Sequence, residues 1–198
     1  TSLDPNAKTT LLPSMTVMGV SMGALIGLPP TLSELYGSNV KKSYQVGGMP
    51  LCLGVLTAAF STFCHLMLLG GILYFAAPLA FDAALPAHPA EYFLALALLI
   101  AVTLSIGCAL GLAVKHQSKL TMVCQIFFLP SILLSGILVP VELLPTPLAE
   151  LGMLFPAYWG YWSMQESGLN WNNLWPLFAI LLAAIAVCSI LLCRIRRR

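Results

Sequence analysis

The sequence predicts an all-α polytopic membrane protein, because it is rich in hydrophobic residues and contains several long apolar segments. Hydrophobic residues make up 59% of its 198 positions and charged residues only 8%, a balance that a water-exposed surface does not tolerate. A helix needs about 20 apolar residues to cross the hydrocarbon core of a bilayer. Within a single domain, 1–198, we expect five transmembrane helices, at about 11–29, 50–81, 92–114, 120–140 and 171–193.

The distribution of basic side chains predicts the orientation of these helices. Cytoplasmic loops of membrane proteins carry an excess of Lys and Arg. If the polar stretch 30–49 lies inside, eight of the nine basic residues also lie inside, and only Lys8 lies outside. We therefore expect a multi-pass protein of the cell membrane, with a cytoplasmic C-terminus and with Thr1 on the extracellular side. Because the chain opens on Thr1 with neither a Met nor a signal peptide, we also expect one further helix upstream, giving six in the full unit.

The first segment, 11–29, has one face of small residues and an opposite face of larger ones. Gly19, Gly23 and Gly27 recur every four residues, so they stack on one side of the helix and let another backbone approach closely. We expect this side to pack against a neighbouring helix, with a direct role in substrate binding as the alternative. The opposite side should face lipid or a pathway, and it carries Ser14, Met18, Ser21 and Leu25.

The polar stretch 30–49 predicts a short amphipathic helix at the membrane surface. Pro29 and Pro30 should end the first transmembrane helix, and the pattern Thr31-x-x-Glu34 is typical of a capping box that opens a new one. Its apolar side chains recur at helical spacing. They are Leu32, Leu35, Tyr36, Val40 and Tyr44. Such a face lies on the membrane or docks against a cytoplasmic partner.

The same stretch resembles a motif of type-2 ABC exporter permeases. It reads Glu34-Leu35-Tyr36-Gly37-Ser38-Asn39-Val40-Lys41-Lys42, followed by Gly48-Met49-Pro50. In that family, the same order of acidic, Gly-Ser or Gly-Thr, basic and Pro residues follows the second helix and forms the coupling helix seated against the ATPase subunit. Ser33 stands where the family usually has an Arg. The resemblance implies that the contacts to the ATPase are made by Glu34, Leu35, Tyr36, Gly37, Ser38, Val40 and Lys41.

The second and third segments each contain one notable feature. His65 lies near the midpoint of 50–81. An imidazole in lipid is costly unless it is hydrogen-bonded, so His65 should face a neighbouring helix or a wet cavity. A packing role and a role toward a substrate or a proton both stay open. In 92–114, Gly107 and Gly111 repeat the four-residue spacing and again predict helix packing.

The six cysteines predict no metal site. All lie inside predicted helices or at their cytoplasmic ends, and none belongs to a Cys-x-x-Cys pair or a cluster with histidine. No cysteine lies in a predicted extracellular loop, where a disulfide would form.

The fourth segment carries a polar and aromatic stripe on an otherwise apolar helix. Its members are spaced by four and three residues, so they share one face. They are Thr121, Gln125, Phe128, Ile132 and Ser135. Such a face prefers protein or water to lipid, although ordinary packing is the alternative for its large side chains. Pro130 should kink the helix.

Stretch 141–170 predicts two short re-entrant helices that enter the membrane from the extracellular side. Pro145 and Pro147 can start a helix and Pro156 can end it. An interfacial aromatic belt should follow, made of Tyr158, Trp159, Tyr161 and Trp162. This region, with Leu134-Ser135-Gly136, Leu144-Pro145 and Phe155-Pro156-Ala157-Tyr158, is similar to the fifth helix and the re-entrant hairpin of the same permease family.

The resemblance implies a permease that pairs with a second permease subunit, identical or related, and with two ABC ATPase subunits. ATP and Mg²⁺ would bind to the ATPases, so we expect no cofactor and no catalytic residue on this chain, and no nucleic acid partner. The pathway would lie between segments 11–29 and 120–140. Side chains without intramembrane charge suit an amphipathic or apolar substrate, such as a drug, a lipid-linked molecule or an antimicrobial peptide.

Two other classes of function are weaker alternatives. An ATP-independent channel or carrier should show broken helices at the midplane or rings of charge, and the one strongly broken region lies at the predicted outer face. An intramembrane enzyme needs a nucleophile paired with a base, and His65 has no recognisable companion.

Overall fold

The computed structural model describes residues 5–37, 51–81, 83–86, 88–114, 116–139, 144–165 and 171–197. All regular structure in these ranges is helical, which confirms the predicted all-α class. Four helices in these ranges are long and apolar enough to cross a membrane: Lys8–Tyr36, Cys52–Phe81, Pro89–Ala113 and Asn173–Arg194. The apolar composition and these helices together support a multi-pass membrane protein.

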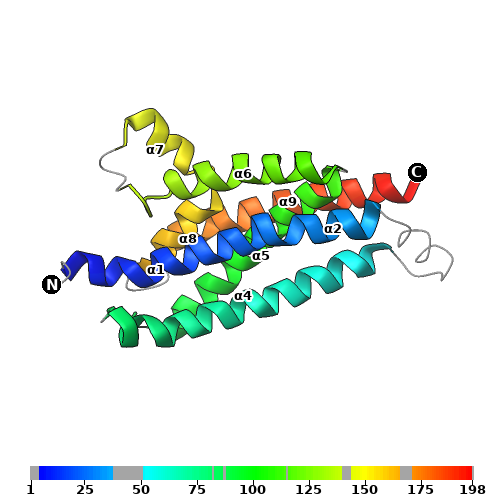
Figure 1. Cartoon of the computed structure of the whole chain (residues 1–198). Helices are drawn as coiled ribbons and strands as arrows, with labels where there is room; N and C mark the ends of the chain where they lie inside the picture. The colour runs from blue at the N-terminus through cyan, green and yellow to red at the C-terminus, as the bar shows by residue number, and fades with distance from the viewer. Residues whose placement is uncertain are drawn as a thin grey trace.

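The first span is a continuous rod of three consecutive elements. α1 (Pro5–Met22) leads into a π-helical turn, η1 (Gly23–Gly27), and then into α2 (Leu28–Gly37), with no break at Pro29 or Pro30 (Figure 1). The prediction that these prolines end the helix was wrong. A π turn bonds each N–H to the carbonyl five residues back instead of four, and this wider turn makes room for the proline rings that follow it.

Thr31 therefore lies inside a helix and does not open one. Its hydroxyl donates to the carbonyl oxygen of Gly27, 3.5 Å away, a bond that threonines inside helices often make. The predicted capping box of Thr31 and Glu34 is absent, because a capping box needs free N–H groups at a helix start. The first part of stretch 30–49 belongs to the first span, and 38–49 lies outside the described residues.

α5 (Pro89–Ala113) is the central helix of the bundle. It packs against α2 and against α4 (Leu51–Phe81), α8 (Pro156–Gln165) and α9 (Trp171–Arg197). Its fully buried side chains include Leu96, Leu99, Ile100, Val102 and Thr103. α5 therefore fixes the positions of the helices around it.

Two glycines bring α5 into backbone contact with the first span. A Cβ added to Gly107 would collide with the carbonyl oxygen of Ala24 in η1. A Cβ added to Gly111 would lie 3.0 Å from the carbonyl oxygen of Pro29. The close approach of another backbone thus limits position 107 to glycine and leaves little room for a side chain at position 111.

α6 (Gln117–Leu133) is a 17-residue helix that ends before the predicted limit of segment 120–140. Pro130 lies within α6 and does not end it. The chain turns beyond the helix at Gly136, whose φ of 86° favours glycine. α6 lies along the first span on the side opposite α4 (Figure 1). That α6 crosses the membrane stays a prediction.

Two short helices follow where a re-entrant pair was predicted. α7 (Thr146–Gly152) starts after Pro145, and Pro156 begins α8. α8 contacts α1, α5 and α9. Its buried residues are Pro156, Ala157, Gly160, Tyr161 and Met164. The predicted aromatic belt is wrong for Tyr161, because this side chain belongs to the core-facing stripe of α8 and is only 6% exposed. The extracellular location of the pair stays a prediction.

We expect Gly107→Ala to lower thermal stability, because the new methyl group would collide with the Ala24 carbonyl oxygen. Overpacking of a core costs about 1–3 kcal/mol, or roughly 2–12 °C in Tm for a chain of this size. Gly27→Ala is the matched control, since a Cβ there has no neighbour within 4 Å. Thermal unfolding in one detergent compares the two variants. A Gly107→Ala protein as stable as the control would contradict the backbone contact.

Candidate functional site

The residues predicted to line a pathway lie on two neighbouring elements, the first span and α6 (Figure 1). The first span is held from one side by α5, where the hydroxyl groups of Thr16 and Tyr92 are 2.7 Å apart and buried. It is held from another side by α4. A Cβ added to Gly19 would lie 3.0 Å from Leu69 of that helix.

One face of α1 stays open between its neighbours. Met15, Met18 and Met22, spaced by three and four residues, are 38%, 43% and 54% exposed. We call these three residues the methionine face. Methionine is unbranched and polarizable, so such a face adapts to partners of different shape.

The predicted stripe on segment 11–29 does not form one open face. Met18 is exposed, whereas Ser21 is fully buried and Leu25 is 2% exposed. Ser14 is half-buried, and its hydroxyl donates to the Thr10 carbonyl oxygen over 2.7 Å. The Ser21 hydroxyl is buried without a hydrogen-bond partner in the described part of the chain. Helical spacing correctly predicted that these four residues share one side of the helix. It did not predict that neighbouring helices bury Ser21 and Leu25.

The predicted stripe on α6 changes from exposed to buried along the helix. Thr121 and Gln125 are exposed and Phe128 is half-buried, whereas Ile132 is 2% exposed and Ser135 is fully buried. The far end of α6 packs against α8, and Gly152 of α7 contacts the Leu134 carbonyl oxygen. Only the first half of the stripe is therefore open in this structure.

The predicted packing glycines have different surroundings within the chain. Gly19 and Gly23 face Leu69 and Leu66 of α4, and Gly107 and Gly111 face the first span. Gly27 is exposed, so it makes no such contact with the described helices.

The predicted coupling residues divide into a buried and an exposed group at the end of α2. Leu35 and Tyr36 are half-buried against the core, and the Tyr36 hydroxyl lies over Gly54 of α4. Glu34 is exposed, and its Oε1 accepts a hydrogen bond of 3.0 Å from Nε2 of Gln117. Gly37 is the last residue of α2. The other predicted contacts lie outside the described residues: Ser38, Val40 and Lys41.

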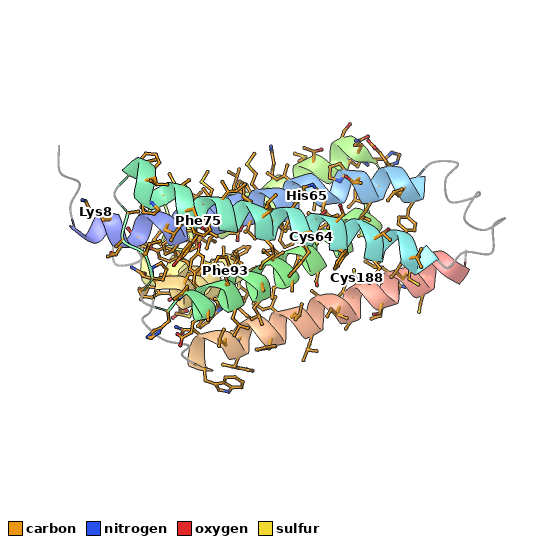
Figure 2. All side chains as sticks on the ribbon, turned by 90° about the horizontal axis from the view of Figure 1, so that it is seen from below. Lys8, Cys64, His65, Phe75, Phe93 and Cys188 are labelled. Carbon is orange, nitrogen blue, oxygen red and sulfur yellow. The ribbon has the colours of Figure 1, made fainter. Side chains whose placement is uncertain are left out.

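His65 lies on an exposed part of α4 (Figure 2). Its Nδ1 is 2.8 Å from the Ser61 carbonyl oxygen. A carbonyl only accepts, so Nδ1 carries the proton. No helix in the described part of the chain covers His65, so the expected neighbouring helix or wet cavity stays a prediction, and the polar side chain finds a hydrogen bond in its own helix. The six cysteines are free thiols, and the described residues contain no cluster of three or more His, Cys, Asp or Glu side chains able to hold a metal.

Sequence reasoning missed two residues that hold the site together, Gln117 and Tyr92. Each forms its bond with a residue far away in the sequence, 83 positions for Gln117 and 76 for Tyr92. The local signal was weak: a polar residue at a turn and an aromatic residue at a helix start.

The model of one known family, described as ABC-2 family transporter protein, matches residues 3–194. The chain belongs to this family. The match confirms the resemblance to type-2 ABC permeases. Membership of this family implies that the protein is the membrane permease of an ABC transporter. No curated protein and no solved structure matches the chain.

We expect cysteines at Met18 and Ser21 of this permease to differ in reactivity. In a cysteine-free background, Met18→Cys should react with a membrane-permeant maleimide roughly tenfold faster than Ser21→Cys, because thiol reactivity follows exposure. Met18 is 43% exposed and Ser21 is fully buried. Mass spectrometry measures the labelling rate of each variant and tests this difference. Equal rates would show that Ser21 faces an open space.

Proposed function

We propose that the chain is the permease subunit of an ATP-driven exporter that moves an amphipathic or apolar substrate out of the cytoplasm. The main support is the family match over residues 3–194. The substrate class is supported by the side chains at the open faces, since neither 15–22 nor 121–129 contains a charged residue. A drug, a lipid-linked molecule or an antimicrobial peptide fits such a surface.

A second permease subunit, identical or related, would face the methionine face and the open half of α6. The pathway would then lie between the two subunits, lined on this side by Met18, Thr121, Gln125 and Phe128. Because Ile132 and Ser135 are buried beside the short helices, the outer half of such a pathway would be closed in this conformation. Opening it requires a movement of α6 relative to α7 and α8.

The energy for that movement would come from two separate ATPase subunits, which bind ATP and Mg²⁺. A nucleotide shifts a conformational equilibrium only through its different affinity for the two states. Reversing a 99:1 preference takes roughly 5.5 kcal/mol. The ATPase would deliver it at the stretch that ends α2 and continues through Ser38, Val40 and Lys41, which we call the coupling stretch (34–41).

We expect ATP-dependent transport by the reconstituted complex. Liposomes containing the permease with its partner ATPase should expel a fluorescently tagged lipid only when ATP and Mg²⁺ are present. Fluorescence dequenching measures the movement, and liposomes with the ATPase omitted are the control. Equal transport without ATP would instead identify a channel or carrier.

We also expect the coupling stretch to be cytoplasmic. In a cysteine-free background, Lys41→Cys should react with an impermeant maleimide in inside-out vesicles and not in right-side-out vesicles, as the bias of basic residues toward the cytoplasm implies. Glu150→Cys, at an exposed position of α7, should show the opposite pattern. Labelling of Lys41→Cys from the outside would rule out ATPase contact at this stretch.

A further inference from the structure

A side-chain hydrogen bond ties the end of α2 to the start of α6. Gln117 Nε2 donates to Glu34 Oε1 over 3.0 Å. Glu34 lies three residues before Gly37, the last residue of α2, and Gln117 is the first residue of α6. The bond therefore joins two helix ends at the same end of the bundle, as Figure 1 shows for α2 and α6.

The start of α6 lacks a negative charge of its own, and the Glu34 carboxylate lies beside it. The N-cap residue His116 is extended, with φ −98° and ψ 119°, and makes no side-chain cap hydrogen bond. The first turn of a helix has free N–H groups and carries a partial positive charge. No acidic residue lies in the first turn of α6 itself. The Glu34 carboxylate brings the missing negative charge from another helix.

The neighbours of Glu34 on α2 have different partners. Tyr36 reaches over Gly54 of α4, and Leu35 packs against the core. Of these three residues of the coupling stretch, Glu34 bonds to α6, the helix whose open half carries Thr121 and Gln125. This bond joins the ends of two helices that also pack directly on each other.

We propose that the Glu34–Gln117 bond is the link through which movement of the coupling stretch reaches α6. This inference rests on the proposed function, and it gives Glu34 a role inside the permease instead of a direct contact to the ATPase. Glu34 and Gln117 are positioning residues: they hold the start of α6 to the end of α2 so that the two move together.

A residue swap tests the link. Glu34→Gln removes the charge but keeps an acceptor oxygen for Gln117. Gln117→Glu sets two carboxylates against each other and should break the link, since like charges at this distance repel. The double variant E34Q/Q117E again places an amide opposite a carboxylate and should restore it. Gln165→Glu, at an exposed position in α8, is the matched control for the same chemical change.

Hydrogen exchange of the permease alone gives the first readout. Gln117→Glu should speed amide exchange in peptide 31–37, the end of α2, about tenfold through local opening, because the new carboxylate repels Glu34, and the double variant should return it to the wild-type rate. The control should leave this peptide unchanged. Wild-type exchange in Gln117→Glu would overturn the link whether or not the protein is a transporter.

The complex with the ATPase gives the second readout. Gln117→Glu should lower substrate-stimulated ATP turnover about fivefold, a loss of about 1 kcal/mol, while the ATPase still co-purifies, and the double variant should recover turnover. Loss of ATPase co-purification in Glu34→Gln and in the double variant would overturn the proposal in favour of direct ATPase contact. A wild-type chain that binds no ATPase would refute the proposed function, and hydrogen exchange would still decide whether the two residues join α2 to α6.

Discussion

The contact on which the rest of the structure depends is the meeting of two backbones, at Gly107 of α5 and the Ala24 carbonyl of η1. Inside a bilayer the hydrophobic effect does not drive helices together, so close packing at small residues takes its place. This contact sets α5 directly behind the first span. The Thr16–Tyr92 hydrogen bond secures the same pair of helices elsewhere along the rod. Because α5 packs against one side of the first span, α1 keeps another side exposed, the methionine face.

Much of the fold was predictable because a membrane-spanning helix requires a long, continuous apolar segment. Such segments predicted the candidate spans of α4, α5 and α9, and the spacing of Gly107 and Gly111 predicted the side of α5 that packs against another helix. The error at Pro29 and Pro30 has a physical origin. A membrane helix tolerates proline where π winding or neighbouring groups satisfy the carbonyls that it frees. η1 lies directly before Pro29 and Pro30, and its winding depends on packing, which the local sequence does not reveal.

The candidate site was predictable in part. Helical periodicity indicates which side chains lie on the same face of a helix. It does not indicate which of them are buried by other helices. Ser21 and Ile132 are buried for this reason, although Met18 and Gln125 on the same predicted stripes are open. The family resemblance drew attention to Glu34, whereas its partner Gln117 could not be found from local sequence, since the fold alone brings together two residues 83 positions apart.

The π turn η1 takes up one residue more than an ordinary turn, because its bonds reach five residues back instead of four. Each residue turns an α-helix by about 100°, so an extra residue in ordinary winding would rotate everything after it by that amount. Taken up inside η1, the same residue leaves α2 in phase with α1 and Glu34 directed toward α6. The rod therefore accommodates at η1 a residue that, inserted elsewhere, would turn the end of α2 away from its neighbour.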